Sequence, residues 1–188
     1  MKYIIYILLS FNLTTFTISA EETRQVDKHE HGVGELNIAV EGSTIEFEFM
    51  IPGADIVGFE YVAKSDEDIA KINQALKTFD DYTNIFTLPS NSLCELNGQK
   101  VALKEDDELD DHDEHDDHDE HAEENHNEFY AKYSFECGDT KAINKVEFPY
   151  FSTFPNSGEL EVQFISSIGS VSFEVEAEEP SINIDGKI

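Results

Sequence analysis

The chain has 188 residues, 41 acidic residues against 12 Lys and Arg, seven histidines and a formal net charge of −29. This acidity excludes nucleic acids and anionic membrane surfaces as natural partners, because both are bound through basic patches, and it favours cations. The length suits one domain with a hydrophobic core of its own.

Residues 1–20 have the layout of a secretory signal peptide. Lys2 stands in a short charged region, an apolar run extends from Tyr3 to about Leu13, and small and polar residues lead to Ala20. The run is too short to span a bilayer, and no second apolar run follows. We expect cleavage near Ala20, one mature domain over residues 21–188, a periplasmic location and no stable membrane insertion. A retained anchor is the alternative.

Alternation of apolar and polar residues dominates the rest of the chain. Residues 35–51 alternate on both sides of Glu-Gly-Ser, which predicts a hairpin with one buried face. Residues 65–79 instead predict a helix, with Ser65 as N-cap and acidic residues in the first turn. The apolar stripe of this helix consists of Ile69, Ile72, Leu76 and Phe79.

Strand patterns resume after the helix. Residues 93–103 predict a hairpin with Asn97-Gly98 at its tip. In residues 129–137 every second residue from Phe129 to Cys137 faces one way, and three more strands are predicted in 145–151, 159–167 and 170–178, with Gly169 in the last turn. We therefore predict a mostly β, α+β domain: an antiparallel sheet or sandwich with one main helix.

Residues 104–127 show no core-like periodicity and predict a flexible acidic insert. Within it, DDHDEHDDHDEH at 110–121 spaces four histidines three residues apart: His112, His115, His118 and His121. This spacing would let histidines chelate in pairs on a helix, or stand in a row about 9 Å apart in an extended polyproline conformation. Nitrogen and carboxylate ligands together suit zinc, and less selectively copper(II) or nickel, whereas calcium prefers oxygen alone. A merely solvated spacer is the alternative.

The other three histidines flank predicted strands. His29 and His31 fall on the same side of an extended segment that leads into the first hairpin, so they can form a more rigid site than the insert. His126 opens the strand after the insert and can complete a site with either group. The alternatives are a disordered N-terminal tail and a histidine at a strand edge.

The two cysteines, Cys94 and Cys137, lie on either side of the acidic run. In an exported chain such a pair predicts a disulfide, here one that fixes the base of the insert, and free thiols are the alternative. No CxxC spacing supports a thiolate metal site, and no HExxH motif supports a zinc-dependent enzyme, so we expect a binding protein and not a catalyst.

Several segments in order carry a family resemblance: HEHG with GELNIAVEG, then IPGADIVGFE, then the His/Asp-rich insert before HNEFYAKYSFEC, then VEFPYFSTFPNSGELEVQFIS. Together they resemble the periplasmic zinc-binding proteins of the ZrgA type. The resemblance implies a protein that captures or buffers zinc and assists a high-affinity zinc importer. The row of insert histidines, completed by carboxylates, predicts several ions per chain. The partners that the resemblance implies are zinc ions and a periplasmic zinc-uptake binding protein or transporter. Non-selective copper or nickel storage is the alternative.

Overall fold

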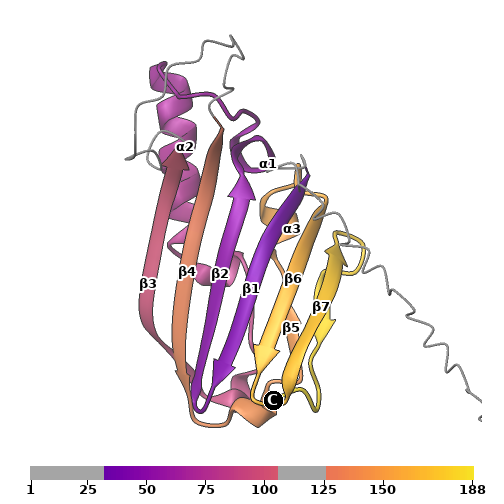
Figure 1. Ribbon diagram of the computed structural model, residues 1–188. Coiled ribbons are helices and arrows are strands. Elements are labelled where there is room, and N and C mark those ends of the chain that lie inside the picture. Colours follow the sequence, from indigo (N-terminus) through magenta and orange to yellow (C-terminus); the bar gives the residue numbers. More distant parts are fainter. Residues whose placement is uncertain (1–31, 106–125) are drawn as a thin grey trace, which may run out of the picture.

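The computed structural model describes residues 32–105 and 126–188. Six strands form one sheet in the order β3-β4-β2-β1-β6-β7 (Figure 1), and β5 and β8 form a second, two-stranded sheet. The strands are β1 Val33–Glu41, β2 Thr44–Pro52, β3 Cys94–Glu105, β4 Asn127–Cys137, β5 Lys145–Glu147, β6 Glu159–Ser166, β7 Gly169–Glu176 and β8 Ser181–Asn183. The α-helices are α1 Gly53–Val57, α2 Asp66–Phe79 and α3 Tyr150–Thr153. Short 3₁₀ turns lie at Tyr82–Asn84, Ser90–Ser92 and Thr140–Ala142.

The predicted β-rich α+β class is confirmed, and so is the first hairpin. β1 and β2 pair antiparallel from Glu41↔Thr44 to Glu35↔Met50. Gly42 has φ 62°, a left-handed conformation that glycine adopts without strain and that this tight turn uses. The apolar residues of both strands face inward, where Phe47 and Phe49 are fully buried.

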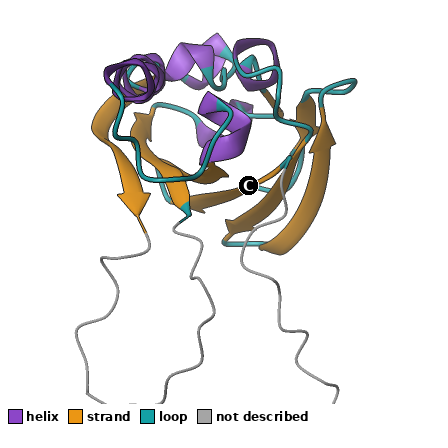
Figure 2. Cartoon of the chain, turned by 90° about the horizontal axis from the view of Figure 1, so that it is seen from above, coloured by secondary structure: helices purple, strands orange, loops and turns teal. Residues whose placement is uncertain are grey.

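The helices gather on one face of the curved sheet (Figure 2), and the core lies between them and the strands. Ser65 caps α2 as predicted, because its Oγ accepts a hydrogen bond of 3.1 Å from the backbone N–H of Asp68. Ile72 and Phe79 are buried against the sheet, whereas Ile69 is 42% exposed. The predicted stripe was therefore wrong at Ile69: the buried side of the helix is completed by Ala75 instead.

The hairpin predicted at Asn97-Gly98 was also wrong. β3 is one continuous strand paired with β4 from Cys94↔Cys137 to Glu105↔Asn127, and the register shifts by one residue between Leu96 and Gly98. The extra residue forms a bulge in place of a turn. Gly98 does not have the positive φ that a two-residue hairpin turn would require.

The sheet is mixed, where an antiparallel sheet or sandwich was expected. β1 pairs antiparallel with β2 on one side and parallel with β6 on the other, from Val33↔Glu159 to Ala39↔Ile165. The strand predicted over residues 145–151 stops at Glu147, because Pro149 interrupts it and the helical turn α3 follows. β8 was not predicted: only Ile182 of its three residues is buried, which is too short a pattern to read.

Candidate metal centre

The end of β3 and the starts of β4 and β1 lie along the same edge of the six-stranded sheet, the edge formed by the ends of these strands (Figure 1). β3 ends at Glu105, and its register partner Asn127 begins β4. β1 begins at Val33, and only β2 separates it from β4 in the sheet. Since neighbouring strands lie about 4.8 Å apart, the start of β1 lies about 10 Å from the start of β4. The N-terminal segment and both ends of the insert are therefore attached to this edge.

His126 lies at this edge, directly before β4. Its Nδ1 is 2.7 Å from Oε2 of Glu60, a residue of the segment that follows α1. The side chain of His126 is 32% exposed and that of Glu60 is 10% exposed. An imidazole paired with a largely buried carboxylate is a common arrangement at metal sites, where the carboxylate orients the ring and increases its basicity as a ligand.

The segment that carries Glu60 is held against the start of β4 by polar and close-packing contacts. Nδ2 of the buried Asn127 donates a hydrogen bond of 3.2 Å to the carbonyl oxygen of Tyr61. Gly53 allows the same side chain to approach α1, because a Cβ there would lie 1.7 Å from Oδ1 of Asn127 and 2.7 Å from the carbonyl oxygen of Phe59. The position of Glu60 is thus set by contacts on both sides of it.

A second carboxylate, Asp55, anchors the point where the chain enters β1. Asp55 is 3% exposed, and its Oδ1 accepts a hydrogen bond of 2.9 Å from the backbone N–H of Gly32. The short helix α1 that carries it begins after Pro52 and ends at Val57, and Gly58 caps it with φ 84°. Gly32 follows His31 in the sequence, so this bond holds the peptide unit that joins the N-terminal histidines to the domain.

The structure describes one of the seven predicted ligands, His126. The other six lie outside the described residues: His29, His31, His112, His115, His118 and His121. Among residues 32–105 and 126–188, no group of three or more His, Cys, Asp or Glu side chains is arranged to hold a metal ion. The full ligand set therefore stays a prediction.

Glu60 and Asp55 are the residues that sequence reasoning missed. Both lie in IPGADIVGFE, a segment that was quoted for its resemblance and whose acids were not singled out. A usable signal was present, because Asp55 stands between Ala54 and Ile56 and is an acid inside an apolar run. Buried acids are rare unless they are paired, so such a position indicates a partner.

The predicted disulfide between Cys94 and Cys137 is present, with the two Sγ atoms 2.03 Å apart. It joins the first register pair of β3 and β4, whereas the insert leaves from the last pair, Glu105↔Asn127. The expectation that the bond fixes the base of the insert was wrong. The two strands run their whole length between the bond and the insert, so the disulfide closes the opposite end of the sheet.

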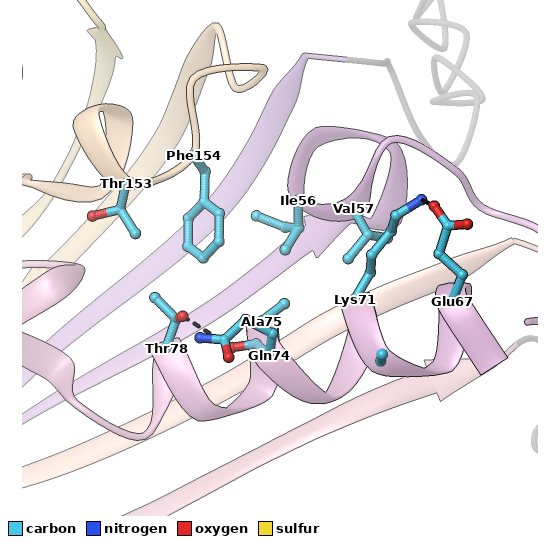
Figure 3. A pocket seen from close by; sticks show the side chains of 10 residues that line it. Ile56, Val57, Glu67, Lys71, Gln74, Ala75, Thr78, Thr153 and Phe154 are labelled. Carbon is cyan, nitrogen blue, oxygen red and sulfur yellow. Dashed lines mark hydrogen bonds and ion pairs between the residues drawn. The ribbon is translucent and has the colours of Figure 1, made fainter.

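A groove of about 570 Å³ runs beside α2 on the helical side of the molecule (Figure 3). Ile56, Val57 and Phe154 face it from α1 and the end of α3, and Lys71 pairs with Glu67 on α2 at 3.0 Å. The lining contains no histidine or cysteine. The groove lacks the nitrogen and sulfur ligands that zinc prefers, so the edge at His126 is the better candidate site.

In a comparison with known protein families, one family model matches most of the chain. A family model described as ZrgA family zinc uptake protein matches residues 28–184, a range that includes the described residues up to Ile184 together with His29, His31 and the whole insert. A comparison with curated proteins gave no match. Among the helices of the described ranges, none combines the length and the apolarity needed to cross a membrane.

Proposed function

The chain belongs to the ZrgA family of zinc uptake proteins, and from this premise we propose that it binds zinc at the sheet edge around His126. The tight site would combine His126 with His29 and His31. The four insert histidines would hold further ions more weakly and raise the local zinc concentration beside that site. Zinc is the cargo of the protein in this proposal, and no catalytic step is involved.

One observation supports this proposal most directly: the His126–Glu60 pair lies at the edge to which the other histidine-bearing segments are attached. Ligands held on regular elements lose little conformational entropy on binding, whereas an insert rich in like charges must order many residues. Residues 105–124 contain 14 acidic residues, which repel one another until cations neutralise them. The edge should therefore bind the first ion and the insert the later ones.

The test is a zinc titration of the mature protein by calorimetry, with chelator competition to measure the tight site. His126→Ala, and separately the pair His29→Ala and His31→Ala, should abolish high affinity and leave weak uptake of several ions. Replacing the four insert histidines by asparagine should reduce the number of ions and keep the tight site. The reverse pattern would invert the assignment, and loss of tight binding in all variants would indicate one composite site.

We further propose that the protein works in the periplasm and delivers zinc to a high-affinity importer. The signal-like residues 1–20 and the zinc uptake family support this location. Cell fractionation and mass measurement of the mature N-terminus would test it. A protein that stays in the cytoplasmic fraction with Met1 retained would contradict the proposal.

Copper(II) or nickel storage is the second candidate function, because histidine and carboxylate ligands bind these ions as well. Raw affinity favours copper(II) over zinc at most such sites. The two candidates differ in what the cell shows. A zinc protein should be needed for growth when zinc is scarce, whereas a storage protein should be needed when copper or nickel is in excess. Growth of a deletion strain under both conditions distinguishes them.

A further inference from the structure

We infer that Glu60 is a positioning residue that fixes which nitrogen of His126 binds zinc. The inference rests on the proposed zinc site and goes one step further, to the tautomer of its ring. Oε2 of Glu60 lies 2.7 Å from Nδ1 of His126. An ionised carboxylate can only accept hydrogen bonds, so the neutral ring that faces it must carry its hydrogen on Nδ1. The lone pair is then on Nε2, which is the nitrogen offered to the metal.

The geometry gives Glu60 an indirect role. The carboxylate oxygen that holds Nδ1 lies on the side of the imidazole away from Nε2, so this contact orients the ring without placing that oxygen on the ion. Without the carboxylate, Nδ1 loses the acceptor that holds its hydrogen, and the tautomer with the hydrogen on Nε2 becomes more populated. In a fraction of the protein molecules, Nε2 would then present an N–H group to zinc in place of a lone pair.

The surroundings of Glu60 keep this contact in place before zinc arrives. Its side chain is only 10% exposed. The residue after it is tied to β4 through the hydrogen bond from Asn127 to the carbonyl of Tyr61, and the ring of Tyr61 stacks on that of Phe59 with centroids 4.7 Å apart. The Oη of Tyr61 also donates a hydrogen bond of 3.3 Å to Asp68 on α2. Glu60 is therefore part of a segment fastened at both β4 and α2.

The experiment compares Glu60→Ala, Glu60→Gln and His126→Ala in the full mature chain. Nitrogen NMR of the histidine rings in the zinc-free protein reports the tautomer of His126, and chelator competition reports the affinity of the tight site. Glu60→Ala should reduce the Nδ1–H form and weaken zinc binding by 10- to 100-fold, the usual effect of removing such a partner. Glu60→Gln should fall between, because an amide can accept from Nδ1–H and can also donate to a bare Nδ1.

Glu46→Gln is the matched control. Glu46 pairs with Lys132 at 3.2 Å on the outer face of the sheet, so its loss should change neither ring signals nor zinc affinity. If His126→Ala leaves tight binding intact, the proposed site is wrong and the inference falls with it. If His126→Ala weakens binding while folded Glu60→Gln keeps the wild-type tautomer and affinity, the site stands and the role of Glu60 is refuted. The tautomer measurement in Glu60→Gln decides the inference even if Glu60→Ala fails to fold.

Discussion

Replacing residues 106–125 by a four-residue turn should leave the fold intact and make it more stable. Glu105 and Asn127 are register partners at the end of the β3–β4 ladder, so their Cα atoms are close enough for a short turn to join the strands. The insert contains only two apolar residues, Leu109 and Ala122, and can add little to a core. His126 is retained in the shortened protein.

The size of the effect follows from chain entropy and charge. For a flexible connection, closing 20 residues costs about 1.4 kcal/mol more than closing four, because the cost grows with the logarithm of length. The deletion also removes 13 carboxylates from a chain whose net charge is −29, which reduces self-repulsion. We expect the free energy of unfolding to rise by at least about 1 kcal/mol at low salt. The charge contribution should shrink as salt screens it.

Urea denaturation at low and high ionic strength measures the stability, and a zinc titration of the same samples measures the sites. The shortened protein should lose the weak ions and keep the tightest one. A loss of stability greater than about 1 kcal/mol would refute the reasoning, since it would mean that the insert contributes packing or bonds of that size. Loss of the tight site in a folded, shortened protein would show that the insert supplies its ligands.

Four further predictions concern the core, stability at high pH, the disulfide and the pH dependence of zinc affinity. Tyr133→Phe should lower the free energy of unfolding by about 1–3 kcal/mol, because the buried Oη of Tyr133 donates a hydrogen bond of 2.6 Å to the carbonyl of Phe79. As the control, Tyr82→Phe in the same aromatic cluster should change the free energy of unfolding by less than about 0.5 kcal/mol. Burial, with Asp80 and Asp81 nearby, raises the pKa of Tyr133, so the folded protein keeps this side chain neutral. Above a pH of about 10 the tyrosine ionises in the unfolded chain, so the stability of the fold should decline there. This decline should be less steep in Tyr133→Phe. Free-thiol labelling of the denatured protein should find no reactive cysteine, and stoichiometric labelling would contradict the disulfide. Replacing both cysteines by serine should lower the free energy of unfolding by about 4 kcal/mol, because the bond spans 43 positions of the chain. Zinc affinity should decrease between a pH of about 7.5 and 6, because protons compete for imidazole near its ordinary pKa of about 6.5, and a flat curve would mean that carboxylates alone hold the ion.

Alternation and capping predicted most of the elements, because these signals act within a few residues. The strand from Phe129 to Cys137 and the helix after Ser65 are present as expected. The signal at Asn97-Gly98 failed for a physical reason: the tertiary pairing of β3 with β4 is continuous from Cys94 to Glu105 and outweighs a local turn preference. The prediction that Ile69 is buried failed similarly. Periodicity gives the apolar side of a helix, but it does not show which positions on that side lie over the sheet.

The site was predicted through its histidines and missed in its carboxylates. His126 was recognised because histidine has a direct use as a metal ligand. Glu60 is 66 residues away from it in the sequence, and the two meet only because α1 and the start of β4 lie at the same sheet edge. No local pattern encodes that meeting. For Glu60 the sequence offered one hint, its place as an acid between two aromatic residues.

The parallel pairing of β1 with β6 has a consequence for the order of folding. β1 is the first strand of the described residues, yet one of its two neighbours is built from residues 159–165. Contacts between segments so distant in sequence form late, because a long stretch of chain must be closed first. Until β6 arrives, β1 is an open edge able to pair with another chain. A C-terminally truncated product, or one still being synthesised, is therefore held short of the native state and is prone to aggregate.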